Sequence, residues 1–172
     1  MDVDLVDVNG VPVADGEVGR VRIRGACVMR GYWGDPSLTA EVLDDDGRLT
    51  STDLGRINDE GNVVLVGRAS DMYIRGGYNV YPLEVENVLM EHPSVAAAAI
   101  VGVPTAVIGE IGAAFVVPTN PLSAPKLDEL RWWVKERLAD YKAPDSLTIV
   151  TALPLTPMLK VDKAELRRLA TT

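Results

Sequence analysis

The stretch from Gly67 to Glu86 places the tightest constraint on how this chain can fold, because three kinds of backbone meet within it. A valine-rich strand pattern leads into it, the pair Gly76 and Gly77 interrupts it, and Pro82 opens a helical pattern near its end. Glycine adopts positive φ without strain and lets a ligand or another backbone approach closely. Taken alone, the stretch is compatible both with an ordinary surface turn and with a functional site.

The residues before this stretch predict an antiparallel β-unit with one short helix. Apolar and polar residues alternate there with period two, which is typical of strands with one buried face. Asp35 and Pro36 supply a helix N-cap and a proline at the first helical position. The predicted strands lie at residues 3–8, 18–23, 49–54 and 63–66, with a turn at 59–62 and the helix at 37–43.

After Arg68 the pattern changes to helices mixed with short strands, which predicts an α+β unit. Strands are predicted at 95–103, 111–117 and 147–150, and helices from Pro82 to near His92, at 126–139 and at 163–169. The expected fold class is therefore α+β: an antiparallel β-subdomain followed by a small mixed domain whose short sheet is flanked by helices. We place the boundary at the start of the constrained stretch, giving domains at residues 1–69 and 70–172.

Composition excludes several classes of function for this chain of 172 residues. A net charge of −8 argues against binding nucleic acid through bulk electrostatics. The single cysteine, Cys27, excludes an intrachain disulfide and a cysteine zinc cluster, and the single histidine, His92, excludes a histidine-rich metal site. No apolar run approaches the ~20 residues that a membrane helix needs, and no secretory leader opens the chain. We expect a cytoplasmic protein without a metal site or a membrane span.

Four consecutive segments carry a specific resemblance. They read GEVGRVRIRGACVMRGYWGDPSLTAEVL, STDLGRINDEGNVVLVGR, GRASDMYIRGGYNVYPLEVE and YKAPDSLTIVTALPLTPMLKVDKAELRR. In order and spacing they resemble the AMP-forming acyl-CoA synthetases of the adenylate-forming superfamily, over nearly the whole chain. The family's phosphate-binding loop and its Tyr-Gly-x-Thr-Glu segment have no counterpart here. The chain thus resembles the last third of such an enzyme: a distorted, barrel-like β-subdomain, a hinge and the mobile C-terminal domain.

The resemblance implies a nucleotide site at Asp53 and Arg68. Asp53 matches an aspartate that accepts hydrogen bonds from the ribose hydroxyls of ATP, although the family usually has Thr-Gly-Asp where this chain has Ser51-Thr52-Asp53. An ionised carboxylate suits that role because it only accepts hydrogen bonds. Arg68 matches an arginine near the ribose and the α-phosphate, where its fork of donors is well suited. The alternative for Asp53 is a plain turn aspartate.

The resemblance also implies a hinge and a channel for the thiol substrate. Ser70 falls at the hinge position, about which the small domain turns between adenylation and thioester formation. Gly76 and Gly77 would face the pantetheine channel, where the absence of side chains lets a thin thiol arm pass.

Lys160 matches the family's catalytic lysine, which neutralises charge as the carboxylate attacks the α-phosphorus. The alternative is an ordinary surface lysine. The family usually has glycine before this lysine, and this chain has Leu159. If that position needs positive φ, leucine costs on the order of 1 kcal/mol or more, which puts the competence of the loop in question.

The implied activity is that of a carboxylic (fatty) acid:CoA ligase that uses ATP, CoA and Mg²⁺ in the full-length enzyme. Since the chain lacks the phosphate loop and the acyl pocket, we expect it to be inactive without the missing N-terminal part of the enzyme. Two alternatives remain open: an adenylation domain that loads a carrier protein, and a non-catalytic module that retains the fold.

Overall fold

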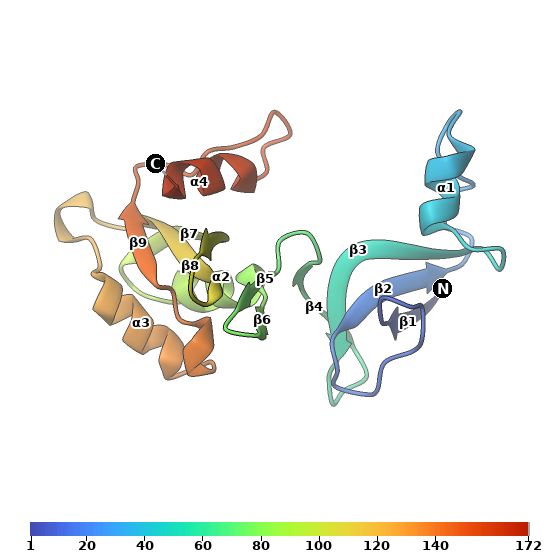
Figure 1. Ribbon diagram of the computed structural model, residues 1–172, viewed down its shortest axis with the longest axis horizontal. Helices are drawn as coiled ribbons and strands as arrows, with labels where there is room; N and C mark the ends of the chain where they lie inside the picture. Colours follow the sequence, from blue (N-terminus) through green and yellow to red (C-terminus); the bar gives the residue numbers. More distant parts are fainter. Residues whose placement is uncertain (172) are drawn as a thin grey trace. The chain divides into compact units, whose positions relative to one another are not determined.

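The computed structural model describes residues 1–171 and divides into two compact units, Met1–Ser70 and a second unit that begins at Asp71 (Figure 1). Each unit combines strands with at least one helix, so the α+β fold class is confirmed.

The first unit is a four-stranded antiparallel sheet in the order β1-β2-β3-β4. Its strands are β1 (Asp2–Val6), β2 (Gly19–Arg24), β3 (Arg48–Ile57) and β4 (Val63–Arg68). Leu5, Val6, Leu54 and Val66 are its buried apolar side chains. The sheet is open, with β1 and β4 as its edges, so the expected barrel-like piece is not closed into a barrel.

One helix, α1 (Pro36–Val42), lies between β2 and β3. Asp35 is its N-cap and accepts a hydrogen bond from the N–H of Leu38 at 2.9 Å, while Pro36 occupies the first turn, where a missing N–H costs nothing. The start predicted from the Asp-Pro pair is confirmed.

The second unit contains a five-stranded sheet in the order β6-β5-β8-β7, with β9 also paired to β8. Its strands are β5 (Tyr73–Arg75), β6 (Tyr78–Val80), β7 (Val95–Thr105), β8 (Gly109–Pro118) and β9 (Ser146–Ile149). Its α-helices are α2 (Pro82–Met90), α3 (Leu127–Lys135) and α4 (Lys163–Ala170), and short 3-10 turns lie at Pro121–Ser123 and Asp140–Lys142. All pairings are antiparallel except that of β8 with β9.

Helices cover both faces of this sheet (Figure 1). Successive side chains of a strand point to opposite faces. On β7, Ala98 and Ile100 pack with α2 and α3, whereas Ala99 and Val101 pack with Leu166 of α4. The second unit is therefore a three-layer domain in which the sheet lies between α2 and α3 on one face and α4 on the other.

Most element boundaries lie a few residues from the predicted ones, and two features differ more clearly from the sequence prediction. Gly76 and Gly77 do not simply interrupt a strand: they form the two-residue turn of a hairpin between β5 and β6. The helix predicted at 126–139 ends at Lys135. Leu138 packs against the same core as the helix, so it continues the apolar pattern beyond the point where the helix stops.

Tyr73 of β5 lies at the centre of this domain and is 1% exposed. Two glycines make room for it: a Cβ at Gly102 would lie 2.4 Å from the Cβ of Tyr73, and a Cβ at Gly112 would lie 2.4 Å from its hydroxyl oxygen. That hydroxyl has no hydrogen-bond partner among the described residues, and burial raises its pKa.

Candidate functional site

Asp53 and Arg68 lie opposite each other on neighbouring strands. They are cross-strand partners of β3 and β4, next to a register shift between Leu54 and Gly55. The Nε of Arg68 is 3.3 Å from Oδ1 of Asp53, and the two side chains are 53% and 41% exposed. An ion pair this exposed adds little to stability, so both groups remain accessible to a ligand.

Gly76 and Gly77 form a turn that requires glycine for its backbone geometry. Their φ angles are 57° and 86°, as in the type I′ turn that joins two strands through two residues. A Cβ at either position would meet nothing within 4 Å. The surface of the turn is open, and the N–H of Gly76 is held by the carbonyl of Ile108 at 2.8 Å.

The strand that leads into this turn is anchored by Arg75, a residue that the resemblance to the family suggests for the mouth of the pantetheine channel. Arg75 forms a two-pronged ion pair with Asp145, with Nη2 2.7 Å from Oδ1 and Nε 2.9 Å from Oδ2. Asp145 also accepts the N–H of Gly112 at 3.1 Å and lies 3.8 Å from Arg131. Burial raises the pKa of Asp145, but the hydrogen bonds from Arg75 and Gly112 and the nearby positive charges outweigh it, so the pKa lies below its usual value.

Lys160 lies in an exposed loop that leads into α4. The loop closes through a hydrogen bond from the N–H of Thr156 to the carbonyl of Lys160 at 2.7 Å. Within residues 1–171, Lys160 takes part in none of the ion pairs. Its ammonium group is therefore available to an anionic ligand.

Leu159, directly before this lysine, has φ of 60° and is the one non-glycine residue with positive φ among those described. Its side chain is exposed, and its N–H donates to the carbonyl of Thr156 at 2.9 Å. The position thus adopts the left-handed conformation that glycine favours, even though leucine occupies it.

The structure brings some of the predicted site residues together and leaves others apart. Asp53 and Arg68 are in contact on β3 and β4, and Ser70 is the last residue of the same unit. In the second unit, the Gly76–Gly77 turn and Lys160 occupy separate loops, one between β5 and β6 and the other before α4 (Figure 1).

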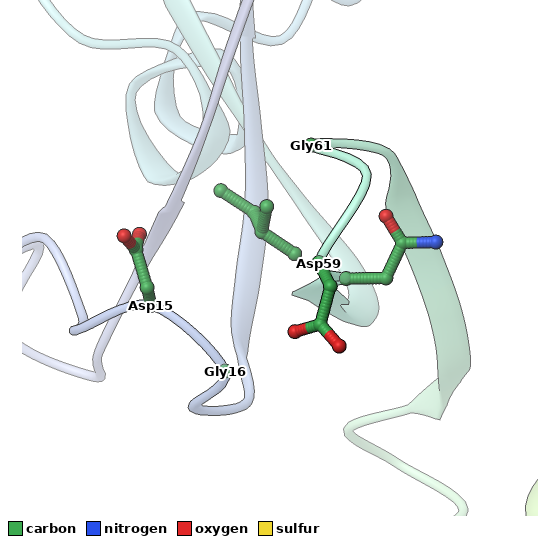
Figure 2. Close-up of a pocket in the computed structure, with 6 residues that line it drawn as sticks. Asp15, Gly16, Asp59 and Gly61 are labelled. Atoms are coloured by element: carbon green, nitrogen blue, oxygen red, sulfur yellow. The ribbon is translucent and has the colours of Figure 1, made fainter.

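A cavity of about 340 Å³ lies elsewhere, between two loops of the first unit (Figure 2). Asp15 and Gly16 line it from the loop before β2, and Asp59 and Gly61 from the β3–β4 turn. It contains none of the predicted site residues. Across residues 1–171, no group of three or more His, Cys, Asp or Glu side chains is arranged to hold a metal ion.

No helix in the described part of the chain is both long and apolar enough to cross a membrane.

Known proteins match both the sequence and the fold. A family model described as the AMP-binding enzyme C-terminal domain matches residues 84–160. A feruloyl-CoA synthase from Amycolatopsis is 46% identical over 167 residues, which cover 97% of this chain and 34% of that protein. A pseudomonine synthase from Pseudomonas entomophila is 40% identical over 169 residues, which cover 98% of this chain and 27% of that protein. An amide bond synthetase from Marinactinospora thermotolerans superposes with a TM-score of 0.92 at 39% identity, over 98% of this chain and 34% of the other.

The fold and these matches define part of an AMP-binding enzyme, and the chain spans about a third of the length of the relatives it matches. Residues 84–160 match the C-terminal domain of AMP-binding enzymes, and the whole chain is similar in sequence and fold to the adenylate-forming enzymes. The resemblance seen in the sequence is confirmed.

Proposed function

We propose that this chain is the C-terminal part of an ATP-dependent, AMP-forming carboxylic acid:CoA ligase. Residues 1–69 form the last β-subdomain of the large domain, and residues 70–172 form the mobile domain, which turns about Ser70. The relatives that support this proposal include a feruloyl-CoA synthase and a medium/long-chain fatty acid:CoA ligase from Mycobacterium tuberculosis.

The observation that carries the proposal is the pairing of Asp53 with Arg68. Their strand register places a hydrogen-bond acceptor beside a fork of donors, with both side chains exposed. The ribose hydroxyls and the α-phosphate are neighbouring groups of one nucleotide. Asp53 binds the hydroxyls, and Arg68 binds the phosphate through charge-assisted hydrogen bonds.

Lys160 acts during adenylation. The carboxylate oxygen of the acid forms a bond to the α-phosphorus, the bond to pyrophosphate breaks, and an acyl-adenylate remains. The ammonium of Lys160 neutralises the charge that develops at phosphorus. In the second step the thiol of CoA gives up its proton, its sulfur attacks the acyl carbon, and AMP leaves. The thiol arm passes over Gly76 and Gly77, whose surface is open.

Mg²⁺ is not assigned to this chain, because its described residues do not form a carboxylate cluster suited to a metal. Mg²⁺ that accompanies a nucleotide is bound largely by the phosphates.

The acceptor of the acyl group is tested by direct competition. Two relatives are named as synthases rather than as CoA ligases, pseudomonine synthase and enterobactin synthase component E. We expect the full-length enzyme, supplied with its acyl-adenylate, to transfer the acyl group to CoA faster than to a pantetheinylated carrier protein. Faster transfer to the carrier would contradict the proposed acceptor.

The role of Lys160 is tested by separating the two half-reactions in the full-length enzyme with a panel of aryl and fatty acids. Lys160→Ala should slow acid-dependent pyrophosphate release on the order of 10²- to 10³-fold, the loss typical of removing one electrostatic stabiliser. Thioester formation from supplied acyl-adenylate should change far less. Lys135→Ala is the matched control, because Lys135 pairs with Asp140 on the exposed side of α3. Equal loss in both steps would reject the role given to Lys160.

The isolated chain is expected to catalyse neither step, because its sequence contains no phosphate loop. Acid-dependent pyrophosphate release by the purified 172-residue chain would contradict this expectation.

A further inference from the structure

Glu86 of α2 is one of two polar or charged residues that are buried in the described chain. Its Oε1 accepts the N–H of Ile100 at 2.8 Å and lies 2.8 Å from Nζ of Lys163. Ile100 is on β7, the edge strand of the sheet, and its N–H faces away from β8. Glu86 thus joins two elements from opposite faces of the sheet, α2 and α4, around that edge.

Lys163 has a second partner at the beginning of the same domain. Its Nζ lies 3.7 Å from Oδ2 of Asp71, and Arg167 approaches the other oxygen of Asp71 at 4.0 Å. Asp71 directly follows Ser70 and is the first residue of the second unit. The side chains of Lys163 and Glu86 are only 18% and 10% exposed, so these charges interact with little screening by solvent.

The loop that carries Lys160 is continuous with the first turn of α4. Leu155 and Val161 form a bridge across its base, and the N–H of Asp162 donates to the carbonyl of Pro154 at 2.8 Å. Asp162 is also the N-cap of α4, whose first residue is Lys163. Whatever holds Lys163 in place therefore also holds the base of the loop.

We propose that Lys163 is a positioning residue for Lys160. Its ion pairs with Glu86 and Asp71 fix the first turn of α4, and through it the loop that presents Lys160. Leu166, which is fully buried, keeps α4 docked on the sheet when these ion pairs are absent. Loss of the ion pairs then displaces the loop without releasing the helix. This inference rests on the proposed role of Lys160 in adenylation.

The variants must separate positioning from folding. Lys163→Met keeps the length of the side chain but leaves the buried carboxylate of Glu86 without its cation, which destabilises the domain. The double variant Glu86→Gln with Lys163→Met removes both charges and keeps an oxygen for the N–H of Ile100. Lys163→Arg retains the positive charge and serves as the conservative variant. Lys135→Met is the control for removing a lysine charge elsewhere.

The experiment measures both half-reactions and hydrogen exchange in the full-length enzyme. The double variant should lower kcat of adenylation on the order of 10- to 100-fold, the cost of small misplacements of a catalytic group. The KM for ATP and the rate of thioester formation should change little, and hydrogen exchange of residues 155–162 should become faster. Lys163→Arg should keep most of the wild-type rate of adenylation. If the double variant adenylates at the wild-type rate while Lys160→Ala is slowed, the inference about Lys163 is overturned and the proposed function stands. Wild-type adenylation by Lys160→Ala would overturn the proposed function itself.

Discussion

Replacing Leu159 with glycine should stabilise the second domain. A left-handed conformation costs an L-residue about 1–2 kcal/mol, and Leu159 has φ of 60°. Glycine removes this cost, but its greater conformational entropy stabilises the unfolded chain by about 0.5–1 kcal/mol. The leucine side chain is 80% exposed, so little burial is lost. The net gain in the free energy of unfolding is roughly 0.5–1 kcal/mol.

Tryptophan fluorescence during thermal unfolding measures this gain. Trp33 of the first unit is fully exposed, so the signal comes mainly from the second unit, where the indole N–H of Trp133 donates to the carbonyl of Val88 at 2.9 Å. Leu159→Gly should raise Tm by roughly 2–8 °C for a domain of this size. Leu159→Ala, which keeps the strained backbone and loses the same exposed side chain, should leave Tm nearly unchanged.

Equal Tm values for the glycine and alanine variants would refute the argument from backbone strain. In the full-length enzyme, Leu159→Gly should change the rate of adenylation by no more than roughly fivefold, the equivalent of 1 kcal/mol. Measurable activity in the wild type together with such a small change would argue against a module that has lost catalysis. A large gain of activity in Leu159→Gly would instead identify leucine as the residue that impairs the loop.

Three further predictions concern Tyr73, the glycine that makes room for it and the nearby carboxylate of Asp145. Tyr73→Phe should leave the free energy of unfolding unchanged or raise it by about 1 kcal/mol, because the buried hydroxyl has no partner. Gly112→Ala should destabilise the wild type by about 1–3 kcal/mol through overlap with that hydroxyl, and less in the Tyr73→Phe background, as a double-mutant cycle in urea would measure. Asp145→Asn should cost roughly 2 kcal/mol at pH 7. The folded pKa of Asp145 lies below the usual value of 3.8 for an aspartate, so its contribution to stability is present above pH 3.8 and is lost as pH falls through the folded pKa. The wild type and the variant should therefore converge in stability in acid.

Much of the fold could be predicted because most strands and helices are longer than one repeat of the apolar and polar pattern that indicates them. The strands β2, β7 and β8 and the helix α4 appear at the expected places, displaced by a few residues at most. The hairpin of β5 and β6 escaped prediction because strands of three residues are too short to show an alternation. The Gly-Gly pair between them is itself a hairpin signal.

Contacts between distant parts of the chain could not be predicted in this way. Arg75 and Asp145 are separated by 70 positions, and each alone has the appearance of a surface charge. Glu84 and Glu86 both lie in the first two turns of α2, where a negative charge suits the positive end of the helix dipole. The structure instead pairs Glu84 with Lys142 and buries Glu86 against Lys163, because the fold of the sheet decides which side of the helix meets another element.

The nucleotide site proposed at Asp53 and Arg68 depends on a detail of strand register that no sequence periodicity reveals. Arg56 and Gly55 of β3 pair with Val64 and Leu65, but Asp53 pairs with Arg68, one position further along β4 than a regular ladder would allow. The extra residue is a β-bulge. Without it, Arg68 would lie opposite Thr52, and its side chain would point to the other face of the sheet from Asp53, since a shift of one residue reverses the face. A single inserted residue in β4 thus determines whether the carboxylate and the guanidinium lie on one face of the sheet, as the proposed nucleotide site requires.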